Sequence, residues 1–497
     1  MNRWVKWIFG IVLLLGGQDL FAATPIQAIT FDQNDATGTQ SQPSPISLAT
    51  IPSGDQVSFL QMTSSKLNGP ETTGSGAAVA WLENGTEIKA ITFAQNGAGA
   101  LSDSGILNLG SVTPGAHVTD FVLGGNEPQA AGLGAFVAWV ENGTNVKAIT
   151  FDALGMSSFI SDIIDLGSVT PGVTMSHFCV TGAFPESAVD QVAVAWVENG
   201  VNIKMNIFYQ NSMSGSQTGI FDVGTANPGA VITDFSITAR SAVSGVASLW
   251  VENKIDIYMT NTTPGQCYIL LGSASPGATI DHFQVTGDFY VLDQSGAAVA
   301  WVENGADFKA ITCQCINGGS MLQLKSPILS LGSASAGAVV SGFQLTGVAP
   351  ESPNSGAAIA WVENGREIKA ITFDAYLNMS FTKSTTPLSL ASITGGRISN
   401  FRLCGSNPES SGLGAAVAWT EKGSDVKAVT FDSYGPTSTQ SDVLSLASID
   451  TNGKIFANFS LTGSFPEIAD AGAAIAWALL PDTPRSWKRP SNPRVGR

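Results

Sequence analysis

The sequence predicts an all-β chain in which eight copies of one four-stranded antiparallel unit close into a ring. Three observations predict it. A Trp-containing phrase recurs eight times, each copy divides into four short strand-like segments, and the two ends of the chain carry complementary halves of one unit. The composition fits a packed fold, because 44% of the 497 residues are hydrophobic and only 12% are charged.

The repeat is clearest in the phrase GAAVAWLENG at residues 76–85, which returns in altered form at regular intervals. Its eight Trp residues are Trp81, Trp139, Trp196, Trp250, Trp301, Trp361, Trp419 and Trp477. Successive Trp residues lie 51 to 60 positions apart. That spacing fits one four-stranded unit with generous loops.

The unit around Trp139 illustrates the four segments, which cover residues 118–123, 135–141, 146–151 and 163–167. All four are rich in Val, Ile, Phe and Thr and are bounded by Gly, Pro, Asn and Ser, which predicts strands. The second segment is apolar on both faces, so each sheet must be covered on both sides, as in a stack.

Two turns connect these strands. Asn-Gly, as at Asn142-Gly143, follows the second segment and favours a tight type I′ hairpin. Pro-Gly, as at Pro114-Gly115, joins the fourth segment of one unit to the first segment of the next. Each unit is therefore a meander of neighbouring antiparallel strands.

The chain ends predict how the ring closes. The chain enters with third and fourth segments only, at residues 26–31 and 46–50, and leaves with first and second segments only, at residues 456–461 and 473–477. These halves make one complete unit, so the N-terminal strands should complete the C-terminal sheet. Closure also removes open sheet edges.

The four-stranded unit, the Trp near the end of its second strand and the split terminal unit resemble the β-propeller repeat proteins over about residues 26–479. The resemblance implies an eight-bladed β-propeller with four-stranded antiparallel blades. The units lack the WD dipeptide at the usual strand end and the double-Gly kelch signature. The resemblance therefore implies no specific named family, and no family function.

We expect three parts in the chain: a signal peptide at 1–23, a single propeller domain at 24–480 and a basic, proline-rich, disordered tail at 481–497. Arg3 and Lys6 precede an apolar run at 7–15, and small Ala22 and Ala23 follow it, as in a secretory signal. An uncleaved anchor is the alternative. We expect an exported monomer, periplasmic, cell-surface or extracellular, and not an integral membrane protein, since no later stretch has the ~20 apolar residues of a membrane helix.

A Glu precedes the hairpin turn in seven units, at Glu83, Glu141, Glu198, Glu252, Glu303, Glu363 and Glu421. A Lys follows six residues later in six of them, at Lys89, Lys147, Lys204, Lys309, Lys369 and Lys427. These residues either form an acidic crown for a cation or a cationic partner, or balance charge across each hairpin at about 0.2–1 kcal/mol a pair. We favour the second interpretation, because a residue repeated in nearly every unit usually serves the unit.

Candidate binding residues occupy the position before the Phe of the first strand, the strand expected nearest the central channel. They are Asp120, His177, Asp234, His282, Asn400 and Asn458, with Gly342 and, less securely aligned, Ser58 in the same position. His and carboxylate groups near an axis suit a metal or acid–base chemistry. The favoured alternative is polar lining of a wide, wet channel. We expect no cofactor, and a divalent cation at these residues is unsupported by any further motif.

A second candidate is the loop at 287–296, which breaks the pattern of the other first-to-second loops. It carries Asp288, Phe289, Tyr290 and Asp293, and its aromatic rings would suit stacking on a sugar or a peptide. Drift of a surface loop is the alternative.

The sequence predicts a non-catalytic binding or scaffolding protein that presents loops to a protein or carbohydrate partner. The net charge of -16 opposes binding of nucleic acid. The alternatives are a polysaccharide hydrolase or lyase with carboxylates at a channel mouth, and a structural envelope or matrix protein. The sequence holds no HExxH, P-loop or GxSxG motif, but a carboxylate-only glycosidase needs none of these.

Overall fold

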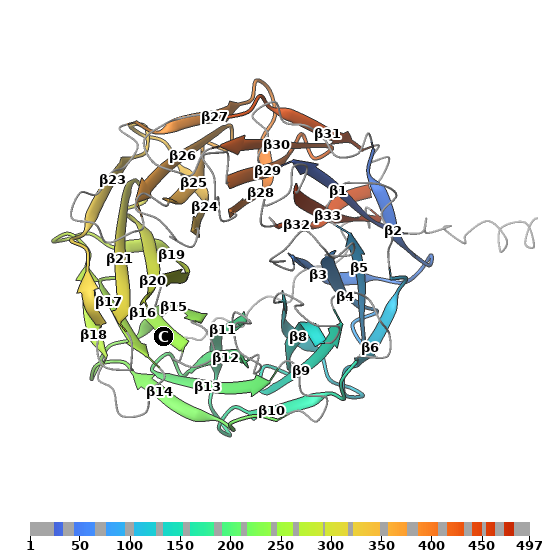
Figure 1. Ribbon diagram of the computed structural model, residues 1–497, viewed down its shortest axis with the longest axis horizontal. Helices are drawn as coiled ribbons and strands as arrows, with labels where there is room; N and C mark the ends of the chain where they lie inside the picture. The colour runs from blue at the N-terminus through green and yellow to red at the C-terminus, as the bar shows by residue number, and fades with distance from the viewer. Residues whose placement is uncertain are drawn as a thin grey trace, which may run out of the picture.

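The chain is an eight-bladed β-propeller, as the sequence predicts (Figure 1). The structure, a computed structural model, describes residues 24–32, 44–64, 76–94, 104–125, 133–152, 160–182, 191–209, 216–239, 246–261, 268–291, 294–316, 322–347, 356–374, 386–405, 415–431, 440–449, 454–462 and 472–481. These residues form strands and turns, and no helix among them is long and apolar enough to cross a membrane.

We number the blades in chain order from the first one whose four strands are consecutive. Blade 1 contains β3 (Val57–Ser64), β4 (Gly76–Glu83), β5 (Glu87–Ala94) and β6 (Leu107–Ser111). Blade 2 contains β7 (Val118–Gly125), β8 (Leu133–Glu141), β9 (Asn145–Asp152) and β10 (Ile164–Ser168). Blade 3 contains β11 (Met175–Gly182), β12 (Gln191–Glu198), β13 (Asn202–Tyr209) and β14 (Phe221–Thr225). Blade 4 contains β15 (Ile232–Ala239), β16 (Val246–Glu252), β17 (Asp256–Asn261) and β18 (Ile269–Ser273).

Blade 5 contains β19 (Ile280–Val291), β20 (Gln294–Glu303), β21 (Asp307–Ile316) and β23 (Leu329–Ser333), and adds a short β22 (Leu322–Lys325) beside β21. Blade 6 contains β24 (Val340–Gly347), β25 (Gly356–Glu363), β26 (Glu367–Asp374) and β27 (Leu388–Ser392). Blade 7 contains β28 (Ile398–Gly405), β29 (Ala415–Glu421), β30 (Asp425–Phe431) and β31 (Leu444–Ser448).

Blade 8 is built from both ends of the chain, which confirms the predicted closure. It orders β2 (Ile46–Ile51), β1 (Thr24–Asp32), β33 (Gly472–Pro481) and β32 (Lys454–Thr462), with Ile26 opposite Ala478 and Ala28 opposite Ala476. The innermost strand of every blade contacts the innermost strands of both neighbours, including β3 with β32, so the ring has no gap (Figure 1).

The hydrophobic core lies between blades. All eight repeat Trp side chains are fully buried, and each packs against a neighbouring blade. Trp139 and Phe121 of blade 2, for example, share one cluster with Ala80 and Leu82 of blade 1. Both faces of the second strands are buried, as the apolar sequence pattern predicts. Small Ala residues and the large Trp are buried together in these clusters.

Candidate functional site

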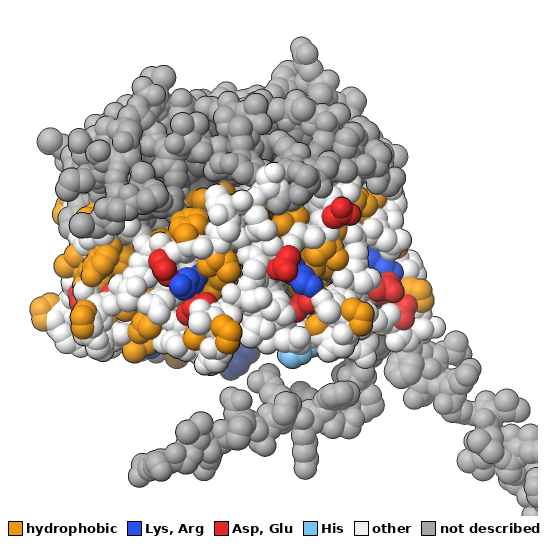
Figure 2. Space-filling view, turned by 90° about the horizontal axis from the view of Figure 1, so that it is seen from below, with side chains coloured by type: hydrophobic (Ala, Val, Ile, Leu, Met, Phe, Trp, Pro, Cys, Tyr) orange, Lys and Arg blue, Asp and Glu red, His pale blue; other side chains and the backbone are white. Residues whose placement is uncertain are grey.

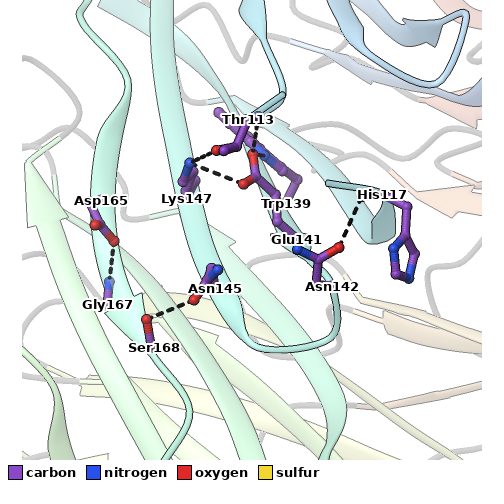
Figure 3. A network of polar contacts seen from close by, with 10 residues as sticks. All are labelled: Thr113, His117, Trp139, Glu141, Asn142, Asn145, Lys147, Asp165, Gly167 and Ser168. Carbon is purple, nitrogen blue, oxygen red and sulfur yellow. Dashed lines mark hydrogen bonds and ion pairs between the residues drawn. The ribbon is translucent and has the colours of Figure 1, made fainter. Parts of the chain in front are cut away.

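The repeated Glu is buried, and it joins two blades. In blade 2 the Glu141 side chain is 1% exposed and accepts a hydrogen bond from Trp139 Nε1 at 3.0 Å. It also accepts one from the backbone N–H of Thr113 at 3.0 Å, and Thr113 lies in the turn that leaves blade 1. Lys147 pairs with its other oxygen at 3.0 Å (Figure 3). One carboxylate therefore fixes its own Trp, its own hairpin and the turn from the preceding blade.

The same connection recurs in blades 3 to 6. The backbone N–H of Thr170, Asn227, Ser275 and Ser335 donates to Glu198, Glu252, Glu303 and Glu363 in turn. Lys89, Lys147, Lys369 and Lys427 pair with the Glu of their own hairpins. The charge-balance interpretation is confirmed in these four hairpins, whereas Lys204 pairs with Asp222 and Lys309 contacts Ser330 instead. The buried carboxylates do not form an exposed acidic crown.

These hydrogen bonds determine the ionisation of the carboxylates. Burial alone raises the pKa of Glu141, but hydrogen bonds from Thr113, Trp139 and Lys147 outweigh burial and hold the pKa at about 2. Burial acts in the same way on Glu363, and hydrogen bonds from Lys369, Trp361 and Ser335 lower its pKa to about 2. Both groups are charged at neutral pH. They belong to what we call the frame, the recurring Trp, Glu, Lys and Asn residues that hold each hairpin and join it to the preceding blade.

The hairpin Asn has two structural roles. Six Asn residues occupy the first turn position with φ of 52 to 55°, a left-handed conformation that Asn tolerates better than most residues: Asn84, Asn142, Asn199, Asn253, Asn304 and Asn364. Each side-chain oxygen also accepts the backbone N–H at the entrance to its own blade. Asn142 Oδ1, for instance, accepts from His117 N at 3.1 Å (Figure 3). In blade 7 Lys422 holds this position with φ 55°.

The predicted axial residues lie on the innermost strands, at a β-bulge that the sequence pattern does not reveal. The register shifts by one residue at this point in every first strand. Gly342, His177, His282 and Asn400 have φ of 53 to 62° there. Gly, Asn and His are enriched at positive φ, so the bulge itself explains part of the residue choice. In blade 1 the positive φ falls on Phe59, so Phe59 rather than Ser58 occupies the position.

Several of these residues connect one blade to the next. His177 Nε2 donates to the carbonyl oxygen of Thr233 in blade 4 at 3.1 Å, and the His282 ring lies 6.4 Å from Phe343 in blade 6. In blade 1, Gln61 lies two residues after Phe59. Its side chain donates to the carbonyl oxygen of Phe121 and accepts from the backbone N–H of Leu123, both in blade 2. Some side chains of the innermost strands, which form the inner wall of the ring, thus connect neighbouring blades.

Three ionisable axial residues, His177, Asp234 and His282, lie on the neighbouring blades 3, 4 and 5. Burial raises the pKa of the Asp234 carboxyl, while the charges of His177, Lys254 and His282 oppose that rise and Asp281 adds to it. Lys254 Nζ lies 3.5 Å from Asp281 Oδ1. Asn400 and Asn458 lie on blades 7 and 8, away from this group, and Asn400 donates to Thr420 Oγ1 in its own blade at 3.0 Å. Asp120 lies on blade 2, within electrostatic range of Cys179.

Metal ligation finds no ready geometry in the described part of the chain, where no group of three or more His, Cys, Asp or Glu side chains is placed to hold an ion. Cys179 and Cys404 are free thiols. Burial raises the pKa of Cys179 and Cys404 to about 12, so these two remain protonated.

The off-pattern loop of blade 5 is a β-hairpin. Strands β19 and β20 run on beyond the usual length, with Phe289 opposite Gly296, Tyr290 opposite Ser295 and Val291 opposite Gln294. Asp288 lies at a register shift in β19, and Asp293 falls outside the described residues. The residues that depart from the repeat therefore lengthen two paired strands of the blade 5 sheet.

The outer rim, seen edge-on in Figure 2, carries acidic and basic side chains next to one another, with apolar side chains between them. Lys204 and Asp222 of blade 3 form one such pair at 2.6 Å. The described side chains on this side of the rim are therefore mixed in charge.

Comparison with known proteins finds no match to any protein-family model and none among the curated proteins. Among solved structures, the WD40 domain of SCAP from fission yeast is 8% identical, with a TM-score of 0.42, covering 82% of this chain and 93% of that chain. The BP39L lectin from Burkholderia pseudomallei is 11% identical, with a TM-score of 0.45, covering 79% and 100%. The SapL1 lectin in complex with alpha methyl fucoside is 13% identical, with a TM-score of 0.30, covering 78% and 97%.

Proposed function

We propose that this chain is an exported, non-catalytic binding or scaffolding propeller for a protein or glycan partner. One observation carries the proposal. In blades 1 to 6 the same Trp–Glu hydrogen bond and the same Asn at the hairpin turn recur, whereas the exposed or half-exposed residues of the inner wall differ. A constant frame with a varied surface is what a binding scaffold requires.

The varied positions proposed to contact the partner are the axial residues, above all His177, Asp234 and His282, and the extended hairpin of blade 5. Together they offer hydrogen-bond donors, acceptors and aromatic rings on separate blades. Such a spread suits a broad partner that spans several blades better than a small molecule held at one point.

A polysaccharide hydrolase remains the second candidate, because of Asp234. Burial raises the pKa of its carboxyl, as expected of a general acid, and Asp281 contributes a second nearby charge. The two functions differ in whether the bound glycan is cleaved.

The test uses the mature chain, residues 24–497, on an array of glycans and surface proteins, with the same preparation assayed for release of reducing ends from each glycan. Binding without release supports the proposal. Release of reducing ends that is lost in Asp234→Asn identifies a hydrolase, and absence of binding to every probe contradicts a binding role.

Export is tested separately, on the N-terminus of the protein recovered outside the cytoplasm. We expect sequencing to begin at Ala23 or Thr24, where β1 starts. Recovery of the chain only inside cells, with Met1 retained, would contradict export.

A further inference from the structure

One outer edge of blade 4 departs from the repeat at four neighbouring positions. The strand residue opposite the Trp is Lys in six blades but Tyr258 in blade 4. In the outermost strand, Leu270 lies opposite Tyr258. The residue opposite the Lys of the other six blades is polar: Asn108, Asp165, Asp222, Ser330, Ser389 or Ser445. The residue before the outermost strand is Ile106, Ile163, Ile220 or Ile328 in four other blades, but Tyr268 here. The turn residue that donates to the buried Glu is Thr or Ser in four other blades, but Asn227 here.

Three of the replacements, Tyr258, Tyr268 and Asn227, contact one another, and Leu270 lies opposite Tyr258 in the outermost strand. The Tyr258 ring stacks on the buried Trp250 with centroids 5.7 Å apart and planes at 21°. Tyr268 meets Tyr258 edge-on, also at 5.7 Å. The Tyr268 hydroxyl donates to Asn227 Oδ1 at 3.1 Å, and Asn227 Nδ2 donates to the Tyr258 hydroxyl at 2.9 Å. Both rings are therefore held in place by hydrogen bonds before any ligand arrives.

The assembly is exposed on the outer rim. Tyr268 is 40% exposed and Leu270 is 46% exposed. In blade 3 the corresponding outermost-strand residue is Asp222, whose side chain is 74% exposed and paired with Lys204. Blade 4 thus presents aromatic and aliphatic surface where its neighbour presents an ion pair.

The frame does not require this surface. The Glu252 carboxylate already accepts hydrogen bonds from Trp250 Nε1, from the Asn227 backbone and from Asn227 Nδ2 at 3.0, 3.1 and 2.8 Å. Asn227 alone therefore replaces the missing Lys as a partner of Glu252. Tyr268 and Leu270 make no contribution to the hydrogen bonds of Glu252. A role in the stability of the hairpin therefore does not explain why these two residues replace the Ile and Asp of blade 3.

We propose that Tyr258, Tyr268, Leu270 and Asn227, here named the blade 4 aromatic edge, bind one or two sugar rings of a neutral glycan. This inference rests on the proposed binding function and adds a ligand class. Pyranose rings offer an apolar C–H face that packs on aromatic rings, and hydroxyl groups that pair with amides and phenols. The net charge of -16 disfavours acidic sugars.

Size favours a glycan over a protein here. A stable protein interface uses roughly 20–30 residues on each side. The blade 4 aromatic edge has four, and the adjoining edge of blade 3 returns to the Lys204–Asp222 ion pair. Preformed rings also lower the ordering cost of binding, which matters most for a small contact.

The test is affinity electrophoresis of the mature chain in native gels containing β-glucan, xylan, galactomannan or α-mannan. We expect at least one polysaccharide to retard the chain, and Tyr268→Ala to weaken that binding at least tenfold. The triple variant Tyr258→Lys, Tyr268→Ile, Leu270→Asp gives blade 4 the residues of blade 3 at these positions and should abolish retardation. Ile220→Ala, the matched change in blade 3, should leave it unaltered. Near-ultraviolet circular dichroism confirms that each variant is folded.

Two outcomes overturn the inference and are distinguishable from failure of the proposed function. If the polysaccharide retards the wild-type chain and Tyr268→Ala equally, the glycan binds elsewhere and only this site is wrong. If no neutral polysaccharide retards the wild-type chain, the ligand class is wrong, and the proposed function is then decided by the protein probes of the array.

Discussion

At the scale of single residues, the ionisable groups that recur in the sequence serve the frame. Glu141 accepts from Trp139, Lys147 and the turn of the preceding blade. A buried donor left without an acceptor is costly, so the carboxylate contributes most through the groups that depend on it. The sequence pairs Glu with Lys at a fixed spacing, but the contact to Thr113 joins residues 28 positions apart and needs the stacked blades to be seen.

Replacing Glu141 by Ala should therefore destabilise the chain by about 3 kcal/mol, since Trp139 Nε1 and Thr113 N–H lose their acceptor and Lys147 its partner. The midpoint of urea unfolding measures the effect. The control is Glu87→Ala, because Glu87 pairs with Lys89 at 3.0 Å but its side chain is 51% exposed. We expect at most about 1 kcal/mol there. Equal losses in the two variants would contradict the role of burial.

The lowered pKa values make a second prediction, on acid stability. Glu141 and Glu363 have folded pKa values of about 2, below the ordinary value of 4.5. Their stabilisation is present in full above pH 4.5 and is lost as pH falls towards 2. The melting temperature of the wild-type chain should decline over this window more steeply than that of Glu141→Gln with Glu363→Gln. Parallel curves for the two proteins would count against ionised carboxylates in the fold.

At the scale of elements, the hairpins show what local sequence can predict. Asn-Gly identifies the tight turn in five blades because both residues accept positive φ, and the structure confirms it at Asn84, Asn199 and Asn364. The bond from the Asn side chain to the entrance of the blade could not be read from the sequence, because it joins two turns through space. The bulge of the first strand was missed for a similar reason, and Phe59 rather than Ser58 takes its left-handed position.

Blade 7 tests the role of the hairpin Asn. Lys422 adopts φ 55° there, and its exposed ammonium lies 3.7 Å from the buried Glu421 carboxylate. Lys422→Asn should stabilise the chain by about 0.5–1 kcal/mol, since Asn is better suited to positive φ and supplies an acceptor for the Arg397 N–H.

The matched reverse change is Asn364→Lys in blade 6, where Asn364 accepts from Val339 N at 3.0 Å. It should destabilise the chain by a comparable amount. Thermal unfolding of the two variants gives both values. A destabilising Lys422→Asn would show that the turn does not need the amide.

The blade 4 aromatic edge shows how far the sequence alone reaches towards a site. The recurrent Lys is missing where Tyr258 stands, and that gap is visible in the sequence. Its meaning is not visible there, because Tyr258, Tyr268 and Asn227 meet only when the outermost strand and the turn from blade 3 are brought together.

At the scale of the whole molecule, the complementary ends of the chain determine the architecture. The third and fourth strands of blade 8 come from residues 24–51, and its first and second strands from residues 454–481. Closing the ring buries both faces of every second strand and leaves no inner strand without neighbours. The sequence predicted this ring because the number of repeats gives the number of blades, and the order of segments within each repeat gives the order of strands. The residues at which the ring binds a partner follow no repeat, so they could not be predicted with the same certainty.

The ring closure is tested most directly by a disulfide between the two ends. In a chain whose native Cys residues are replaced by Ala, we expect Ala28→Cys with Ala476→Cys to form an intramolecular disulfide, because the two residues are directly opposed in β1 and β33. Ala28→Cys with Ala474→Cys should not form one, since Ala474 is opposed to Thr30. Peptide mapping of the monomer gives the answer. A disulfide found only between two chains, or formed equally by the mismatched pair, would contradict a ring closed by its own ends.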